Sequence, residues 1–189
     1  KILEVNRIGI TMGDPAGIGP EIIVKTLYEM SPEVRSRSIV IGNIDFLDRA
    51  SRMIDAKLQF SDSLEIDGGV VPVLHVSTTE SEAIKDGEVS ASAGEAAYRY
   101  VEKAVELSLD KVISVIVTAP LNKAAMHLAG HKYDGHTELL ADLTGAKASF
   151  MLLAGPKLNA IHVSTHTSLA NAATKPSTQR VLDTIRIGN

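Results

Sequence analysis

The sequence predicts an α/β fold built around a parallel sheet. Short runs of apolar residues alternate along the chain with segments whose apolar residues recur at helical spacing. Loops rich in glycine and proline separate these segments. This alternation is typical of βαβ units, in which a helix covers the sheet between two strands. The 189 residues, 44% of them hydrophobic, suffice for one large domain or for part of a two-domain protein.

The first part of the chain predicts two strand–helix pairs. A buried strand is expected over residues 7–11, and a helix should begin near Pro20, because proline lacks the amide hydrogen that the first helical turn leaves unpaired. A second buried strand is expected over residues 38–42. Asn43 follows it and is a natural N-cap for the next helix.

The middle of the chain continues the same pattern. Residues 70–76 predict a third strand, and the polar segment 77–87 predicts a surface excursion. Small and apolar residues at helical spacing predict a long amphipathic helix over 90–109. Residues 111–118 have an all-apolar centre, which predicts a strand of a parallel sheet that is covered on both faces.

The last part predicts two further strands and a helix. The strands are expected over 150–153 and 159–164, on either side of a turn at Gly155 and Pro156. Residues 177–187 carry an apolar stripe typical of a helix, with no partner element after it. We therefore expect the given chain to end in the middle of its architecture.

Composition limits the classes of function. A net charge of −4 and an isoelectric point near 5.9 give no basic surface for nucleic acid. The absence of cysteine excludes disulfides and thiolate ligands. The sequence contains neither an apolar run of about 20 residues nor a signal-peptide core. We expect a cytoplasmic protein with neither nucleic-acid nor membrane partners.

Three loops are expected at one rim of the sheet, because ligands of such folds bind outside the carboxyl ends of the strands. They begin at Thr11, Thr118 and Ser164. The first reads T-M-G-D-P-A-G-I-G-P-E, and its glycines would let the backbone approach a ligand. A tight strand-to-helix turn explains the glycines about equally well. A G-x-G-x-x-G reading fails at Ile22, and the chain has no phosphate-binding P-loop motif.

The second loop, T-A-P-L-N-K from Thr118, places two polar residues just after a strand. Asn122 either caps the following helix or serves a ligand. Lys123 is either a solvated helix residue or a contact to a phosphate or carboxylate group. Asp14 of the first loop and Lys123 are candidates for a general base, but the sequence assigns that role to neither.

A third motif, G-H-T-E, begins at Gly135 and opens an amphipathic helix. Thr137 either presents its hydroxyl group to an anion or caps this helix. Capping leaves His136 unexplained. His136 is therefore a candidate for a ligand contact.

A fourth motif, H-V-S-T-H, begins at His162. Strand alternation would place His162, Ser164 and His166 on one face, with His166 at the carboxyl end. A lone histidine is more often structural, and we apply this rule to His75, His127, His131 and His162. His166 is the exception because its neighbours are rich in oxygen atoms, but one histidine does not make a metal site, and the chain has no H-E-x-x-H motif.

Taken together and in this order, the four motifs resemble the 4-hydroxythreonine-4-phosphate dehydrogenase family of pyridoxal phosphate (vitamin B6) biosynthesis. The M-G-D and A-P-L forms are closer to the branch that oxidises 4-phospho-D-threonate. The resemblance implies a three-layer α/β/α fold of the isocitrate/isopropylmalate dehydrogenase type. Residues 1–189 would then be the N-terminal portion of a two-domain enzyme, with a change of domain near residues 120–135.

The resemblance also implies a reaction and its requirements. The reaction is an oxidation, with decarboxylation, of a 4-phosphorylated hydroxy acid such as 4-phosphohydroxy-L-threonine or 4-phospho-D-threonate. It would use NAD or NADP and one divalent ion (Zn, Mg, Co or Mn), in a homodimer with shared active sites. By motif, His136 and Thr137 match the substrate contacts, and His166 matches the first of three metal histidines.

The other two histidines belong to the motifs N-P-H-A-G-E and Y-H-D-Q-G, which the chain does not contain. The fragment alone is therefore expected to be inactive. Two alternatives remain open. One is a diol dehydrogenase that acts on a non-phosphorylated cyclic acid, and the other is an inactive fragment that only binds a ligand.

Overall fold

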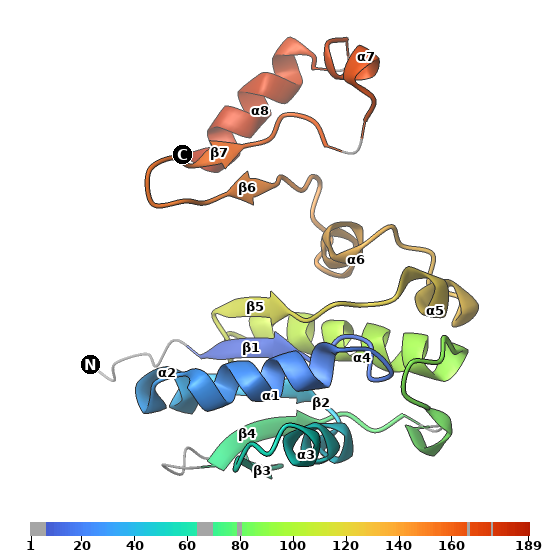
Figure 1. The fold of residues 1–189 in the computed structure, drawn as a ribbon. Helices are drawn as coiled ribbons and strands as arrows, with labels where there is room; N and C mark the ends of the chain where they lie inside the picture. Colours follow the sequence, from blue (N-terminus) through green and yellow to red (C-terminus); the bar gives the residue numbers. More distant parts are fainter. Residues whose placement is uncertain (1–6, 64–69, 79–80, 166, 175) are drawn as a thin grey trace. The chain divides into compact units, whose positions relative to one another are not determined.

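The computed structural model describes residues 7–63, 70–78, 81–165, 167–174 and 176–189 (Figure 1). The chain divides into two compact units, Lys1–Gly145 and Ala146–Asn189. The change of domain expected near residues 120–135 concerns the whole enzyme and stays a prediction.

The first unit contains a parallel sheet with the strand order β3-β4-β2-β1-β5. The strands expected near residues 7, 38, 70 and 111 are all present. The short β3 was not expected, because three residues are too few to show a periodic pattern. The strands are β1 (Ile8–Thr11), β2 (Ser38–Gly42), β3 (Gln59–Ser61), β4 (Val70–His75) and β5 (Val115–Thr118).

Helices cover both faces of this sheet (Figure 1). On one face lie α1 (Gly19–Glu29) and α3 (Ile44–Met53), which pack against each other, and on the other lies α4 (Ala91–Leu109). This arrangement confirms the three-layer α/β/α fold. The shorter helices of the unit are α2 (Pro32–Ser36), the 3-10 helix η1 (Ser81–Ala83), α5 (Lys123–Leu128) and α6 (His136–Leu143).

The buried apolar residues of the unit form two clusters. The larger one lies between the sheet and the helices and includes Ile41, Leu47 and Val73, each with no exposed surface. The smaller one joins three helices and consists of Ala97 and Val101 of α4, Met126 of α5 and Leu139 of α6. The smaller cluster therefore holds α5 and α6 against α4.

Both asparagines considered as helix caps occupy that position. The side-chain oxygen of Asn43 accepts a hydrogen bond from the amide of Asp45 at 2.8 Å. That of Asn122 accepts one from the amide of Ala125 at 3.2 Å. Each bond satisfies an amide that the first helical turn leaves unpaired.

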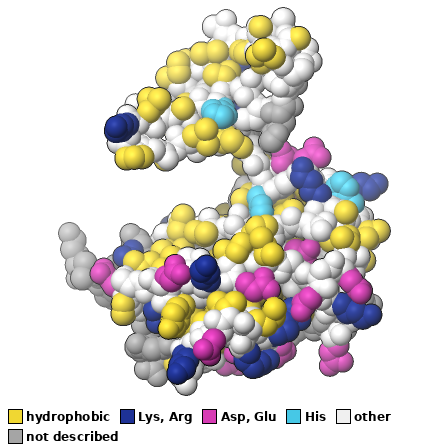
Figure 2. Space-filling view, viewed as in Figure 1, with side chains coloured by type: hydrophobic (Ala, Val, Ile, Leu, Met, Phe, Trp, Pro, Cys, Tyr) yellow, Lys and Arg dark blue, Asp and Glu magenta, His cyan; other side chains and the backbone are white. Residues whose placement is uncertain are grey.

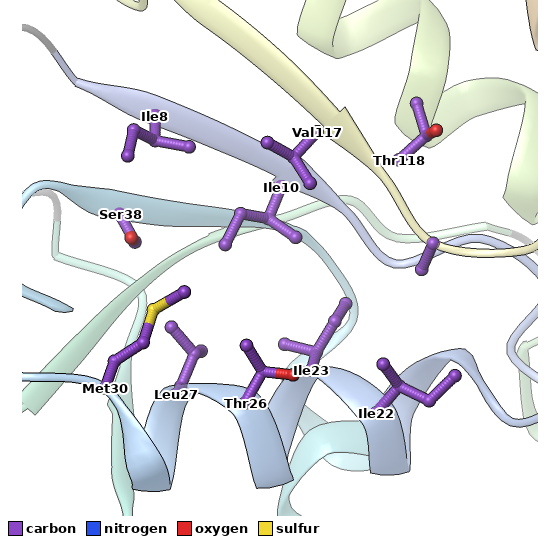
Figure 3. Close-up of a pocket in the computed structure, with 11 residues that line it drawn as sticks. Ile8, Ile10, Ile22, Ile23, Thr26, Leu27, Met30, Ser38, Val117 and Thr118 are labelled. Atoms are coloured by element: carbon purple, nitrogen blue, oxygen red, sulfur yellow. The ribbon is translucent and has the colours of Figure 1, made fainter. Parts of the chain in front are cut away.

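The expectation that the strand near residues 111–118 is covered on both faces is wrong for this chain. β5 is one of the two edge strands of the sheet, and Val115 and Val117 are 48% and 46% exposed. On the α1 side, Val117 lies with Ile10 and Ile22 around a cavity of about 180 Å³ (Figure 3). Figure 2 shows apolar side chains on this face. An apolar run indicates that a strand suits burial, but it does not specify which segment covers the strand.

The second unit contains two short strands and two helices. The strands β6 (Leu152–Leu153) and β7 (Ala160–Ile161) are antiparallel, and α7 (Leu169–Ala172) and α8 (Thr178–Gly188) follow. β7 ends before His162, so the expectation that His162 and Ser164 lie on one face of a strand is wrong. The two leucines of β6 are more than half exposed. A two-stranded ribbon that buries so little apolar surface is only marginally stable, which explains why both strands are short.

None of the helices in the described part of the chain combines the length and the apolarity that crossing a membrane requires.

Candidate functional site

The loops after β1 and β5 lie side by side at the carboxyl end of the sheet. Thr11 and Thr118 are register partners in neighbouring strands. The amide of Ala119 donates to the carbonyl oxygen of Thr11 at 3.0 Å. The expected common rim is therefore confirmed for these two loops. The loop at Ser164 follows β7, which belongs to a separate two-stranded sheet in the second unit.

The glycines of the first loop allow it to pack closely. Gly13 has φ +69°, and a Cβ atom there would lie 2.8 Å from the carbonyl oxygen of Ala119. A Cβ atom on Gly19 would overlap the carbonyl oxygen of Met12. The structure thus gives Gly13 and Gly19 a packing role, which for Gly19 agrees with the tight-turn interpretation. A Cβ atom on Gly17 would make only ordinary contacts, the nearest at 3.5 Å from the carbonyl oxygen of Asp14.

Asp14 is a buried carboxyl group in this loop, with 6% of its surface exposed. Its Oδ1 accepts a hydrogen bond from the amide of Ala16 at 2.8 Å, which helps to shape the loop. Burial raises the pKa of Asp14, and the hydrogen bond from Ala16 only partly opposes this effect. A positioned carboxyl group with a raised pKa is suited to exchange a proton.

The two polar residues of the second loop differ in their surroundings. The side-chain oxygen of Asn122 is engaged as the cap of α5, so capping accounts for this residue. Lys123 is the first residue of α5 and is exposed. The structure places Lys123 in solvent contact at a helix N-terminus.

His136 is the first residue of α6 and is partly buried. Its Nε2 atom is buried and makes no hydrogen bond with any of the described residues. The same is true of the hydroxyl group of Thr11 at the end of β1. Buried polar atoms are rarely left unpaired in proteins, so this nitrogen is suited to a ligand. Burial also lowers the pKa of His136, which favours the neutral imidazole.

The N-terminus of α6 leaves its first amides without a side-chain partner. Gly135 occupies the N-cap position, and no side chain accepts a hydrogen bond there. The interpretation of Thr137 as the cap is therefore wrong, because Thr137 lies one residue inside the helix. Thr137 is exposed, and its hydroxyl group lies beside backbone amides that favour an anion.

The predicted metal ligand, His166, lies outside the described residues. Within the described ranges, no three histidine, cysteine, aspartate or glutamate side chains are grouped so that they could hold a metal ion.

Three histidines interpreted as structural do have protein partners. His75 accepts a hydrogen bond from the amide of Ile44, and His127 Nε2 lies 3.4 Å from the carbonyl oxygen of Tyr133. His131 Nε2 lies 2.6 Å from a carboxylate oxygen of Glu95. Glu95 could not be identified as this partner from the sequence, because it lies 36 positions from His131 and local spacing carries no signal over that interval.

Comparisons with known proteins agree with the motifs. The family described as "Pyridoxal phosphate biosynthetic protein PdxA" matches residues 34–189. The chain is 43% identical over 187 residues to the D-threonate 4-phosphate dehydrogenase of Cupriavidus necator, covering 96% of the chain and 56% of that protein. The chain thus spans little more than half the length of this relative.

Two solved structures are similar in fold. A 4-hydroxythreonine-4-phosphate dehydrogenase from Burkholderia phymatum matches with a TM-score of 0.89 at 40% identity, over 97% of this chain and 57% of the other. A terephthalate 1,2-cis-dihydrodiol dehydrogenase from Burkholderia xenovorans matches with a TM-score of 0.70 at 26% identity, over 96% and 55%.

Proposed function

Because the chain belongs to the pyridoxal phosphate biosynthetic protein PdxA family, we propose that the whole protein oxidises a 4-phosphorylated hydroxy acid with NAD or NADP. Candidate substrates are 4-phospho-D-threonate and 4-phosphohydroxy-L-threonine. The names of similar proteins support this substrate class. The proposal includes decarboxylation, one divalent ion and a homodimer with shared active sites, all of which the motif resemblance implies.

The observation that carries the proposal is the unpaired, buried Nε2 of His136 at the N-terminus of α6. We assign substrate binding to His136 and Thr137. The hydroxyl group of Thr137 and the first amides of α6 would hold an anionic oxygen, because the helix dipole places partial positive charge there. His136 would complete the contact with its imidazole nitrogen.

The lowered pKa of His136 is consistent with this role. A neutral imidazole accepts or donates a hydrogen bond at Nε2, depending on which ring nitrogen carries the proton. It therefore suits a substrate hydroxyl group, which can act as either partner. Holding this hydroxyl group in a fixed place is the step that orients the carbon to be oxidised.

The metal ion would polarise the substrate hydroxyl group when bound. We propose His166 as one of its ligands. The role that we assign to His136 and Thr137 is substrate binding.

The test is reduction of NAD or NADP by the whole protein with each phosphorylated acid, with and without a chelator. Turnover that the chelator abolishes is expected. Replacing His136 or Thr137 with Ala should raise the KM about tenfold or more, because each change removes a hydrogen bond to a charged or polar substrate group. Lys103→Gln, which replaces an exposed residue of α4, is the control and should leave KM unchanged. Absence of turnover on both acids, or full activity with chelator, would exclude the proposal.

A second candidate is a diol dehydrogenase acting on a non-phosphorylated cyclic acid. The similarity to the terephthalate dihydrodiol dehydrogenase favours it, at lower identity than the phosphorylated class. Inorganic phosphate distinguishes the two, because it should compete only with a phosphorylated substrate.

The third candidate is an inactive fragment that only binds a ligand. It predicts no turnover by the whole protein but retained binding of the phosphorylated acid. Titration of a divalent ion into the 189-residue chain should reveal no tight stoichiometric site, since only His166 of the three metal histidines is present.

A further inference from the structure

The segment from Gly130 to Gly135 connects α5 to α6 and leads directly to His136. α5 ends in a Schellman motif. Gly130, with φ +91°, donates its amide to the carbonyl oxygen of His127, and His131 donates its amide to that of Met126 at 2.9 Å. This ending fixes the direction in which the chain leaves α5 and places His131 at the start of the connecting segment.

The side chain of His131 is held by two residues of α4. Its Nε2 lies 2.6 Å from Oε2 of Glu95, and its ring stacks on Tyr98 with centroids 3.6 Å apart and planes 4° apart. The other carboxylate oxygen of Glu95 accepts a hydrogen bond from Arg99 at 2.7 Å. Both oxygens of Glu95 are therefore engaged, so the carboxylate has a defined orientation.

The charges in this group favour a persistent contact. Burial alone would raise the pKa of Glu95, but the hydrogen bonds and charges of His131 and Arg99 outweigh it and lower this pKa. Glu95 is therefore ionised at neutral pH. The side chains of His131 and Glu95 are 23% and 35% exposed, so their bond is less screened by water than a fully exposed pair.

The part of α4 that holds His131 is itself tightly packed. Gly94 lies so close to α5 that a Cβ atom would overlap the backbone of Ala125. The buried cluster of Ala97, Val101, Met126 and Leu139 joins the same turns of α4 to α5 and α6. At the far end of the segment, the hydroxyl group of Tyr133 donates to Asp142 of α6 at 2.6 Å.

We propose that Glu95, Tyr98 and His131 form a clamp that positions the segment before His136, and thereby the substrate contacts His136 and Thr137. The three are positioning residues, and this role rests on the function proposed above. Without the clamp, the segment 130–135 loses the hydrogen bond and the ring stack that His131 makes with α4, and only Tyr133 still packs against the buried cluster. The His136 imidazole and the first turn of α6 then sample more orientations, and substrate binding weakens.

The test uses the whole protein and four single variants. His131→Ala and Glu95→Ala should each raise the KM for the phosphorylated acid about fivefold to tenfold, with a smaller change in kcat, because the lost bond is charge-assisted. His131→Gln keeps an N–H donor near the Nε2 position and should recover most of the affinity. Lys103→Gln removes another salt bridge of α4, that with Glu106, and should leave KM unchanged.

Amide hydrogen exchange of residues 130–136, measured without substrate, separates the clamp from the proposed function. Exchange should be faster in His131→Ala and Glu95→Ala than in the wild type and in Lys103→Gln. Unchanged KM and unchanged exchange in both alanine variants would overturn the clamp. A wild type without turnover would overturn the proposed function, and the exchange comparison would still decide whether the clamp orders this segment.

Discussion

The amide of Asp14 donates a hydrogen bond of 2.9 Å to the carbonyl oxygen of Pro120 and so joins the loop after β1 to the loop after β5. The residue before Asp14 is Gly13, whose left-handed backbone lies against the carbonyl groups of Ala119 and Pro120. The rim at this end of the sheet therefore depends on a close backbone contact between two loops that are far apart in the sequence.

Gly13→Ala should destabilise the protein more than Gly87→Ala. Both glycines have nearly the same φ, +69° and +73°, so a left-handed alanine costs about 1–2 kcal/mol at each. At Gly13 the added Cβ also meets backbone atoms of Ala119 and Pro120, whereas no atom of the described residues lies within 4 Å of a Cβ atom built on Gly87. Urea denaturation of the two variants measures the difference. Equal losses would show that the loops can separate without penalty.

Asn122→Ala should lower the free energy of unfolding by about 1 kcal/mol, because it removes the cap of α5. Asn122→Ser retains a capping oxygen and should restore most of this loss. Substrate KM should stay near the wild-type value in the serine variant. A large rise in KM with unchanged stability would instead assign Asn122 to the ligand.

His136 should titrate below its ordinary value of 6.5, because burial lowers its pKa. The folded state favours the neutral imidazole, so the contribution of His136 to stability is fully present above pH 6.5. This contribution is lost as the pH falls toward the folded-state pKa, because the unfolded chain binds the proton first. NMR titration of the imidazole gives the pKa of His136. Urea denaturation of the wild type and of His136→Asn at both ends of this pH range gives the contribution of His136 to the pH dependence of stability. An anionic ligand beside the ring should raise the pKa; a midpoint at or above 6.5 in the free protein would contradict the burial effect.

The free energy of unfolding of Asp14→Asn, relative to that of the wild type, should be higher at pH 7 than at pH 4. Burial raises the folded-state pKa of Asp14 above 3.8, so the wild type loses stability as the pH rises from 3.8 through this raised value. The asparagine does not titrate, and its side-chain oxygen can still accept the bond from Ala16. The comparison is the difference in unfolding free energy between variant and wild type at the two pH values. A difference that does not grow with pH would show that the carboxylate is well solvated.

Much of the fold could be predicted because its signals are local. The apolar runs that became β1 and β2 were recognised from a few consecutive residues. Asn43 and Asn122 were identified as possible caps from the residue type and the helix that follows. His136 and Thr137 are candidates on similarly local evidence, their position at the start of an amphipathic segment, and their role as substrate contacts stays a prediction that the motif resemblance supplies.

Other features depended on which segments meet. The sequence by itself determined the order of the longer strands and helices of the first unit, since hydrogen bonding and apolar spacing act over a few residues, whereas the three-residue β3 left no such signal. Only the tertiary structure decided that β5 is an edge strand, that Ser164 lies outside the main sheet, and that Gly135 rather than Thr137 is the cap. It alone paired His131 with Glu95, because contacts between distant residues arise from the packing of whole helices, here of α5 against α4 at Gly94.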